Sequence, residues 1–173
     1  MYFMIIAQVI GLIGMVFGIL AFQCKKSENI VKVRLMSEAI FSIHYLMLGA
    51  YTGAIMNWVG CIRNFCFNRN NKKGKNNNPY IVLFCLVFII SGSISWESSI
   101  SIFPILSKVI TTYAYSLTNA KKLRFLTIPS SIGWLIYNLM CHSLSGVLTE
   151  IFCLTSIAIA IYRFNLLKKG NDD

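Results

Sequence analysis

The sequence predicts an all-α membrane protein with seven transmembrane helices, and two observations carry that prediction. First, 56% of the 173 residues are hydrophobic and only 13% are charged, and the mean hydropathy is +0.64. A soluble domain of this size has no core large enough to bury so much apolar surface. Second, the charged residues gather in short breaks between apolar runs of about the length that a helix needs to cross a bilayer.

Seven apolar segments fill most of the chain, each close to the roughly 17–25 residues of a transmembrane helix. Turn-forming residues separate them, and the longest break is the basic, Asn-rich run NRNNKKGKNNNP at 68–79. The first segment has no basic residue before it and lysines after it, which is typical of a membrane span rather than of a cleaved signal peptide. The predicted segments are residues 3–22, 31–49, 52–68, 80–96, 99–117, 123–141 and 144–166.

The basic residues indicate which loops face the cytoplasm. Apart from Arg63 and Lys108, every Lys and Arg is assigned to the loops after the first, third, fifth and seventh segments, and the other loops have none. The positive-inside rule then predicts an N-terminus outside and a C-terminus in the cytoplasm. The residues of these basic loops are Lys25, Lys26, Lys32, Arg34, Arg69, Lys72, Lys73, Lys75, Lys121, Lys122, Arg124, Arg163, Lys168 and Lys169.

Two stretches of the chain resemble one another: HYLMLGAYTGAIMN at 44–57 and YNLMCHSLSGVLTE at 137–150. The same ungapped offset of 93 residues aligns the first three segments with the last three, and it pairs identical residues such as Gly53 and Gly146. This pattern predicts a parallel 3+1+3 repeat, a plan known to build transporters. Its units are a three-helix bundle (1–68), a basic loop with a linker helix (69–98), a second three-helix bundle (99–167) and a cytoplasmic tail (168–173).

Several motifs support a family resemblance over nearly the whole chain. They comprise Gln8, Gly11, His44, Gly49, Asn57, Arg63, Pro104, Trp134, Tyr137, Asn138, Gly146 and Glu150. With these residues the chain resembles the bacterial inner-membrane YgjV-type family, and its 3+1+3 plan is more distantly similar to the SWEET, SemiSWEET and PQ-loop transporters. The first resemblance implies a bacterial inner membrane protein. The second implies movement of a small polar solute through a pocket between two bundles.

The chain departs from the sugar-transporter pattern at the inner end of the first span. Phe22-Gln23 stands where those transporters have a Pro-Gln pair, and the aligned pair in the second half is Tyr115-Ser116. The first two spans contain no proline, so Pro104 and Pro129 are the candidate hinges. These departures argue against sugar transport by the SWEET hinge mechanism.

Charged residues inside predicted spans are the strongest functional signal, because an ionised side chain is costly in a bilayer. At about 1.5 Å per residue, Glu38, Arg63 and Lys108 each lie about 15 Å from the outer span end, near the middle of a roughly 30 Å core. We expect them to converge, with the amides of Asn64 and Asn138, on a solute site. Two cations favour a carboxylate or a phosphate. The alternative is a Glu38–Arg63 pair that only joins helices.

Other polar residues are expected nearer the outside, at about 7–9 Å for Asn57 and Glu150. These two are repeat partners, as are His44 and Tyr137, and all four are candidates for an outer gate or for coupling. Glu150 either accepts a proton during transport or acts as a fixed strut. Pro104, one turn before Lys108, is expected to bend its helix as a hinge or as a static kink.

The leading functional prediction is a transporter that works by alternating access, and the alternative is a receptor, scaffold or assembly factor whose charges are structural. An intramembrane enzyme is disfavoured because no HExxH motif, acidic metal cluster or paired serine nucleophile is present. The six cysteines form no CxxC pair, so no metal or cofactor is predicted. The expected partners are the lipid bilayer and a small polar solute, and the sequence is compatible with an oligomer. Nucleic acid is not expected, because the basic run lacks interleaved aromatic residues.

Overall fold

The computed structural model describes residues 2–166, and in that part of the chain the fold is all-α with seven α-helices and no strand. The predicted all-α class and number of helices are therefore confirmed for this part of the chain. The helices are α1 (Tyr2–Phe22), α2 (Ser27–Leu48), α3 (Tyr51–Lys72), α4 (Asn78–Ile94), α5 (Ile102–Ser116), α6 (Ala120–Met140) and α7 (Leu144–Ile161), with a 3-10 turn η1 (Ser99–Ser101) and a π-helical turn η2 (Tyr162–Leu166). Lys168 and Lys169 and the predicted tail lie outside the described residues.

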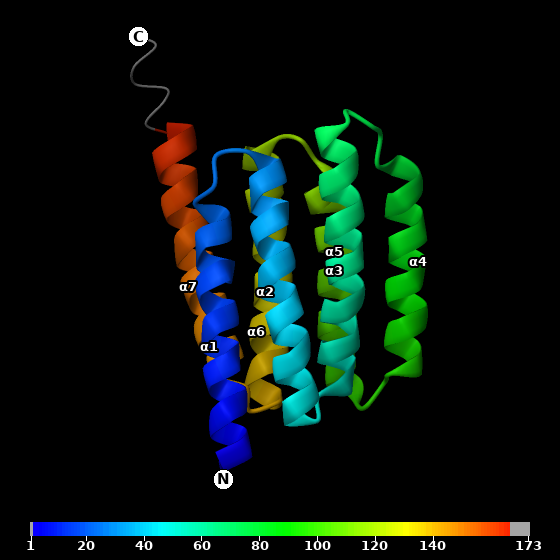
Figure 1. Ribbon diagram of the computed structural model, residues 1–173, viewed down its shortest axis with the longest axis vertical. Coiled ribbons are helices and arrows are strands. Elements are labelled where there is room, and N and C mark those ends of the chain that lie inside the picture. Colours follow the sequence, from blue (N-terminus) through cyan, green and yellow to red (C-terminus); the bar gives the residue numbers. More distant parts are fainter. Residues whose placement is uncertain (1, 167–173) are drawn as a thin grey trace.

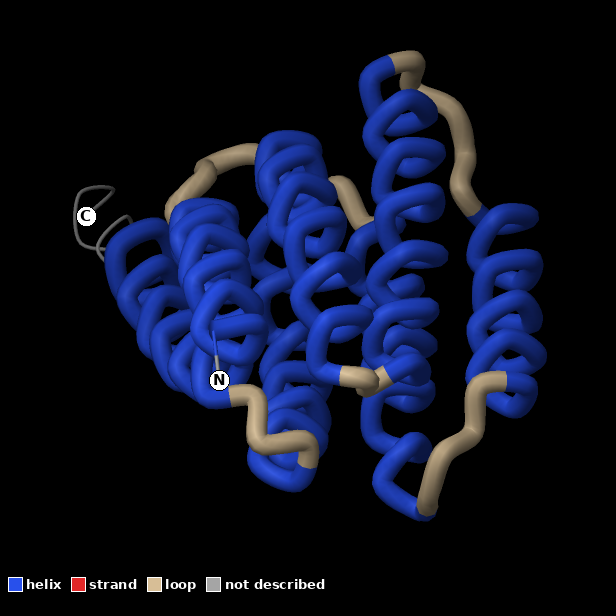
Figure 2. The backbone as a smooth tube through the Cα atoms, turned by 60° about the horizontal axis from the view of Figure 1, so that its bottom comes forward, coloured by secondary structure: helices blue, strands red, loops and turns tan. Residues whose placement is uncertain are grey.

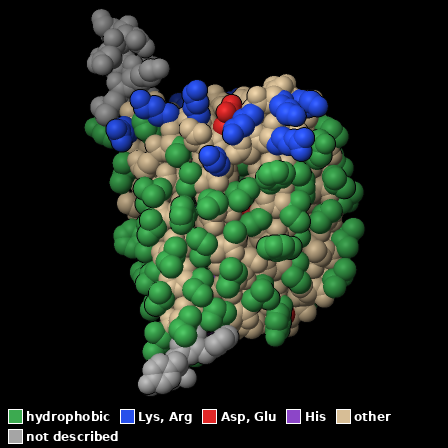
Figure 3. Space-filling view, in the orientation of Figure 1, with side chains coloured by type: hydrophobic (Ala, Val, Ile, Leu, Met, Phe, Trp, Pro, Cys, Tyr) green, Lys and Arg blue, Asp and Glu red, His purple; other side chains and the backbone are tan. Residues whose placement is uncertain are grey.

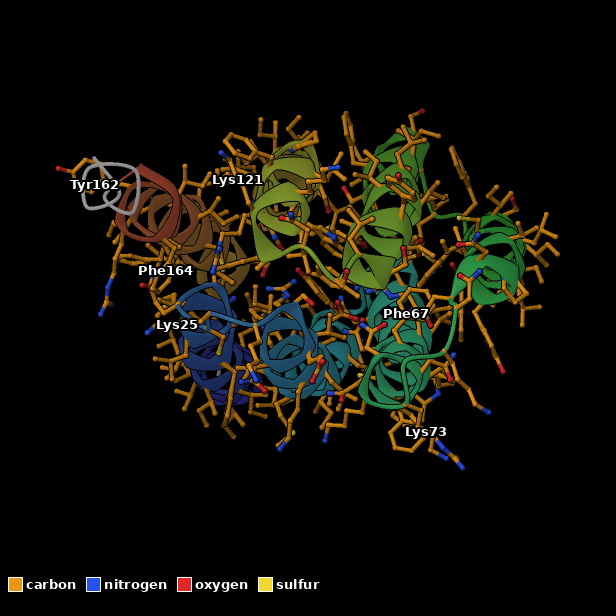
Figure 4. The ribbon with its side chains drawn as sticks, turned by 90° about the horizontal axis from the view of Figure 1, so that it is seen from above. Lys25, Phe67, Lys73, Lys121, Tyr162 and Phe164 are labelled. Atoms are coloured by element: carbon orange, nitrogen blue, oxygen red, sulfur yellow. The ribbon has the colours of Figure 1, made fainter. Side chains whose placement is uncertain are left out.

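The helices form two rows that pack face to face (Figures 1 and 4). One row is α1–α2–α3 and the other is α7–α6–α5, with α1 against α7 and α3 against α5. Helix α4 packs beside α5 and α3 at one end of the rows. Short loops join successive helices at alternating ends of the bundle (Figure 2).

Local sequence signals explain where the helices stop and start. Gly49 ends α2 with a φ of 73°, the left-handed conformation that glycine adopts without strain, and its N–H donates to the Leu46 carbonyl. The Asn119 side chain accepts from the first backbone N–H groups of α6, and the Ser143 side chain does the same for α7. Pro79 occupies the first turn of α4, where its missing N–H has no helical partner to lose.

Several basic residues lie in helices rather than in the predicted loops. Lys32 and Arg34 lie inside α2, which begins at Ser27. Likewise, α3 continues to Lys72, and α6 begins at Ala120, before the predicted residue 123. The helical residues corrected in this way are Lys32, Arg34, Arg69, Lys72, Lys121, Lys122 and Arg124. The exposed basic side chains still gather at one end of the bundle (Figure 3).

The outside of the bundle is apolar and its inside is unusually polar. Large hydrophobic side chains such as Phe65, Val82 and Ile94 are exposed, and below the basic end they cover the visible face (Figure 3). The interior buries charged, amide and hydroxyl side chains. By length and composition alone, Met4–Phe22 (19 residues) and Leu144–Phe164 (21 residues) qualify as membrane spans. Asn78–Ile94 is also apolar but shorter.

Candidate functional site

Three charged side chains from three helices meet inside the bundle. Glu38 of α2 accepts an ion pair from Arg63 of α3 (Nη2–Oε1, 3.3 Å) and another from Lys108 of α5 (Nζ–Oε2, 3.0 Å). Each of the three residues is at most 2% exposed. One carboxylate therefore balances two cations, and this group, the charged triad, keeps a formal charge of +1.

Arg63 is the most heavily bonded member of the triad. Its Nη1 donates to the hydroxyls of Thr111 and Thr112 on α5 (both 3.1 Å), and its Nε and Nη2 both donate to Asn64 Oδ1 (3.1 and 2.9 Å). The guanidinium also lies over the Phe88 ring of α4, 5.3 Å from its centroid. Because each guanidinium nitrogen has a partner, Arg63 links α2, α3, α4 and α5.

Lys108 makes fewer contacts and spans both rows. Besides Glu38, its ammonium donates to Asn57 Oδ1 on α3 (3.2 Å) and lies over the Trp134 ring of α6, 5.3 Å from its centroid. Asn57, which was expected nearer the outside, therefore contacts the triad, because the long lysine side chain crosses the difference in depth. Gly60 makes room for this arrangement: a Cβ there would overlap Glu38 Oε2 and lie 2.8 Å from Lys108 Nζ.

A small cavity lies beside the triad, between the two rows. Its volume is about 10 Å³, which is close to the least space that holds one water molecule. Glu38 and Asn57 line it from one row, and Asn138 and Glu150 line it from the other. The buried Asn138 Nδ2, like Arg34 Nε on the same cavity, has no hydrogen-bond partner among the described residues. The cavity is thus rich in polar groups but has no space for a solute larger than water.

Glu150, the carboxylate on the α7 side of this cavity, is 6% exposed. It takes part in none of the ion pairs between described side chains. Both carboxylates of the site therefore face the same cavity, but only Glu38 is paired with cations within 4 Å. In the part of the chain that the structure describes, no three His, Cys, Asp or Glu side chains group as metal ligands would.

His44 and Tyr137 join the rows at the end opposite the basic residues. His44 Nδ1 lies 2.7 Å from the Ala7 carbonyl of α1, and His44 Nε2 lies 2.8 Å from Ser143 Oγ at the start of α7. Tyr137 of α6 accepts a hydrogen bond from the Gly53 N–H of α3 (3.0 Å). At this end of the bundle, His44 thus joins α2 to α1 and to the start of α7, and Tyr137 joins α6 to α3.

Pro104 lies near the start of its helix. Because α5 begins at Ile102, Pro104 falls in its first turn. The N–H that proline lacks would have no partner at that position, so proline is tolerated there without a kink. The expected bend of the helix at Pro104, as a hinge or as a static kink, stays a prediction. Pro129, in contrast, lies inside α6.

Matching hydrogen bonds occur at positions 93 residues apart. The Ser37 hydroxyl of α2 donates to the Gly14 carbonyl of α1 (2.9 Å), and the Ser130 hydroxyl of α6 donates to the Ser107 carbonyl of α5 (3.1 Å). The Tyr45 hydroxyl donates to Asn138 Oδ1 (2.6 Å), and these two positions are separated by the same offset.

The same correspondence relates the two seams at which the rows meet. At the α3–α5 seam, Arg63 donates to Thr112. At the α7–α1 seam, the equivalent residue Ser156 donates to the carbonyl of Ile19, the residue that corresponds to Thr112 (2.9 Å). Each seam thus joins the third helix of one half to the first helix of the other at the same register.

Two arginines with partly or fully buried side chains, Arg34 and Arg124, were assigned to loops from the sequence, and that assignment is wrong for both. Arg34 lines the cavity and lies four residues before Glu38, on the same face of α2. Arg124 is 1% exposed and donates to the carbonyls of Phe22 (3.3 Å) and Cys24 (2.7 Å), where α1 ends. The spacing of Arg34 and Glu38 was the available signal, because the predicted segment 31–49 contains both, but Arg34 was counted with the preceding basic loop.

A family model described as a bacterial inner membrane protein, Imp-YgjV, matches residues 5–168. The chain belongs to this family. Inner membrane protein YgjV of Escherichia coli (strain K12) is similar to it, with 21% identity over 171 residues that cover 96% of this chain and 89% of the relative. No solved structure matches the chain. The predicted YgjV-type membership is confirmed, and the chain is a member of an inner membrane protein family. The SWEET resemblance stays a prediction.

Proposed function

We propose that this YgjV-family protein crosses the inner membrane seven times and moves a small polar solute by alternating access between its two rows. The observation that carries the proposal is the charged triad, which borders a small, polar cavity between the rows. Ionised side chains at such depth are costly and typically mark solute or ion pathways in membrane proteins. The exposed basic residues gathered at one end support an N-terminus outside and a C-terminus in the cytoplasm.

The paired hydrogen bonds support a parallel 3+1+3 repeat as the basis of this motion. Ser37 and Ser130 make the same bond within each half, and the two seams match in register. In this proposal α1–α3 and α5–α7 are the two bundles, and α4 is the linker that restores their common orientation. Transporters with this kind of symmetry hold their solute at the interface of the repeats.

The contacts suggest different roles for the residues of the proposed solute site. Each guanidinium nitrogen of Arg63 has a partner on Asn64, on α5 or on Glu38, so Arg63 and the Asn64 carbonyl that accepts from it position the triad. Lys108 and the free amide of Asn138 are the groups that a solute contacts directly. An entering carboxylate or phosphate would replace Glu38 at Lys108, and this exchange favours an anionic or zwitterionic solute. Asn57, Glu150, His44 and Tyr137 are the proposed gate and coupling residues.

Because the cavity is so small, this structure would correspond to a closed state of the proposed transport cycle. A space of about 10 Å³ admits no metabolite. The rows would therefore separate at one end at a time, and the contacts of His44 and Tyr137 would break when the outer end opens. A bound solute shifts this equilibrium only by the difference between its affinities for the two states.

A second candidate function is a receptor, scaffold or assembly factor in the membrane. The saturated bonding of Arg63 favours it, because a guanidinium with a partner for each nitrogen holds helices together without any solute. On this account the triad is only structural, and its charges have no role in recognition.

A ligand screen on the purified protein separates the two functions. We expect carboxylates, phosphates or zwitterions from a metabolite library to raise the melting temperature in detergent and to cross the membrane of proteoliposomes. Lys108→Met should abolish both effects, whereas the matched control Lys25→Met, in the exposed loop after α1, should keep them. A wild-type protein that neither binds nor moves any of these solutes would favour the scaffold.

A further inference from the structure

Two surface grooves flank the basic end of α3, far from the charged triad. The first has a volume of about 370 Å³ and lies between α2 and α3, where Lys32 and Lys72 line it. The second has a volume of about 250 Å³ and lies between α3 and the start of α4, where Lys73 and Lys75 line it. Phe65 and Arg69 line both grooves, so the two form one continuous surface around α3.

In the first groove, cations lie at the rim and exposed apolar side chains lie below them, an order that matches the headgroup and the acyl chains of a phospholipid. On α2, Met36 lies one turn below Lys32, and on α3, Phe65 lies one turn below Arg69, a step of about 6 Å toward the middle of the bundle in each case. Met36 and Phe65 are both exposed although they are apolar. A phosphate would therefore meet cations at the rim, and an acyl chain would lie against the apolar residues below.

The cations of these grooves are free to bind an anion. Lys32, Arg69, Lys72, Lys73 and Lys75 are exposed and make no ion pair or side-chain hydrogen bond with any described residue. Glu28 is the one carboxylate near this end in the described part of the chain. The apolar floor at membrane depth distinguishes the surface from one that binds a soluble polyanion. Basic pockets at the cytoplasmic ends of membrane helices are typical sites for anionic lipids.

We propose that these grooves bind one phospholipid with two phosphates, of the diphosphatidylglycerol class, in the cytoplasmic leaflet. Lys32 and Lys72 hold one phosphate, Lys73 and Lys75 hold the other, and Arg69 lies between them. The acyl chains of one half of the lipid lie over Met36 and Phe65. This assignment rests on the membrane orientation proposed above but is independent of solute transport.

Native mass spectrometry of the detergent-purified protein tests the site. With added diphosphatidylglycerol we expect one tightly bound lipid per chain, and we expect phosphatidylglycerol and phosphatidylcholine to bind at least about tenfold more weakly. Arg69→Gln should raise the Kd by about tenfold, and adding Lys32→Gln and Lys73→Gln should abolish tight binding. The control Lys121→Gln/Lys122→Gln, on exposed lysines of α6 at the same end, should bind as the wild type does.

The alternative results overturn the proposal in distinct ways. Equal affinity for phosphatidylglycerol would exclude the two-phosphate assignment, and equal affinity for phosphatidylcholine would exclude an anionic site altogether. An unchanged Kd in the triple variant would exclude these grooves. Since the substituted side chains are exposed and unpaired, circular dichroism and melting temperature without lipid should match the wild type, which separates lost binding from lost folding.

Discussion

The α3–α5 seam and the α7–α1 seam are built alike but differ in charge. At one, Arg63 crosses to Thr112, and at the other, Ser156 crosses to Ile19. Glu38 likewise corresponds to Ser131, which is buried but uncharged. The two ion pairs between described side chains thus lie at the α3–α5 seam, whereas the α7–α1 seam is joined at the equivalent position by a hydroxyl bond to a backbone carbonyl. The comparison teaches that the rows can be joined at this register without an ion pair, so the ion pairs of the α3–α5 seam need another explanation.

The largest expected effect comes from removing the carboxylate of the α3–α5 seam. Glu38→Gln leaves Arg63 and Lys108 buried without a counter-charge, and breaking a buried pair in this way costs about 3–5 kcal/mol. The equivalent Ser131→Ala should cost only about 0.5–1.5 kcal/mol, as one lost hydrogen bond does. Unfolding by SDS titration in mixed micelles measures both. Equal losses in the two variants would mean that the seams do not differ as described.

A double variant sharpens the same comparison. Glu38→Gln/Lys108→Met removes one charge of each sign, and we expect it to be more stable than Glu38→Gln alone by about 1–3 kcal/mol, because residues of one network couple by that order. The SDS titration of both variants gives the difference. A double variant that is less stable than Glu38→Gln would show that the buried Lys108 does not need Glu38 as its counter-charge.

Gly60→Ala adds a single methyl group to the α3–α5 seam. It would overlap the Glu38 carboxylate, and we expect a loss of about 1–3 kcal/mol from overpacking. Gly18→Ala is the matched control at the other seam, where the nearest atom to the new Cβ is Cys153 Sγ at 3.2 Å. Melting temperatures of both variants in one detergent check the order. A larger loss for Gly18→Ala would argue against the close packing of Gly60 on the triad.

The smallest effects should be nearly equal in the two halves. Ser37→Ala and Ser130→Ala each remove the hydrogen bond that joins the first two helices of a half, and we expect about 0.5–1 kcal/mol for each. SDS titrations of the two variants provide the comparison. Losses that differ severalfold would weaken the structural equivalence of the halves.

The helix number was predictable because apolar runs and turn residues report it directly. The 93-residue offset also anticipated which positions make equivalent hydrogen bonds, such as Ser37 and Ser130. The convergence of Glu38, Arg63 and Lys108 followed from counting residues along helices of known rise.

Other features depend on contacts that such counting cannot supply. Lys108 reaches Asn57 because its side chain is long, and a depth taken from the backbone ignores that length. Arg34 was missed because sorting the basic residues by loop placed it with Lys25 and Lys26, although it lies inside α2. The order of the rows and the small cavity depend on packing between distant segments, which periodicity within one segment does not report.

Alternating access to the cavity is the central claim, and labelling of a cavity residue tests it most directly. Thr149 lines the cavity, and its hydroxyl bonds only to a carbonyl of its own helix, so Thr149→Cys is a mild change. In a background without the six native cysteines, sealed vesicles would be treated from either side with a membrane-impermeant thiol reagent. The control is Ala114→Cys, which is fully buried and lies away from the cavity. Alternating access predicts that Cys at 149 reacts from both sides and Cys at 114 from neither. A Cys at 149 that reacts from neither side, or always from the same one, would contradict it.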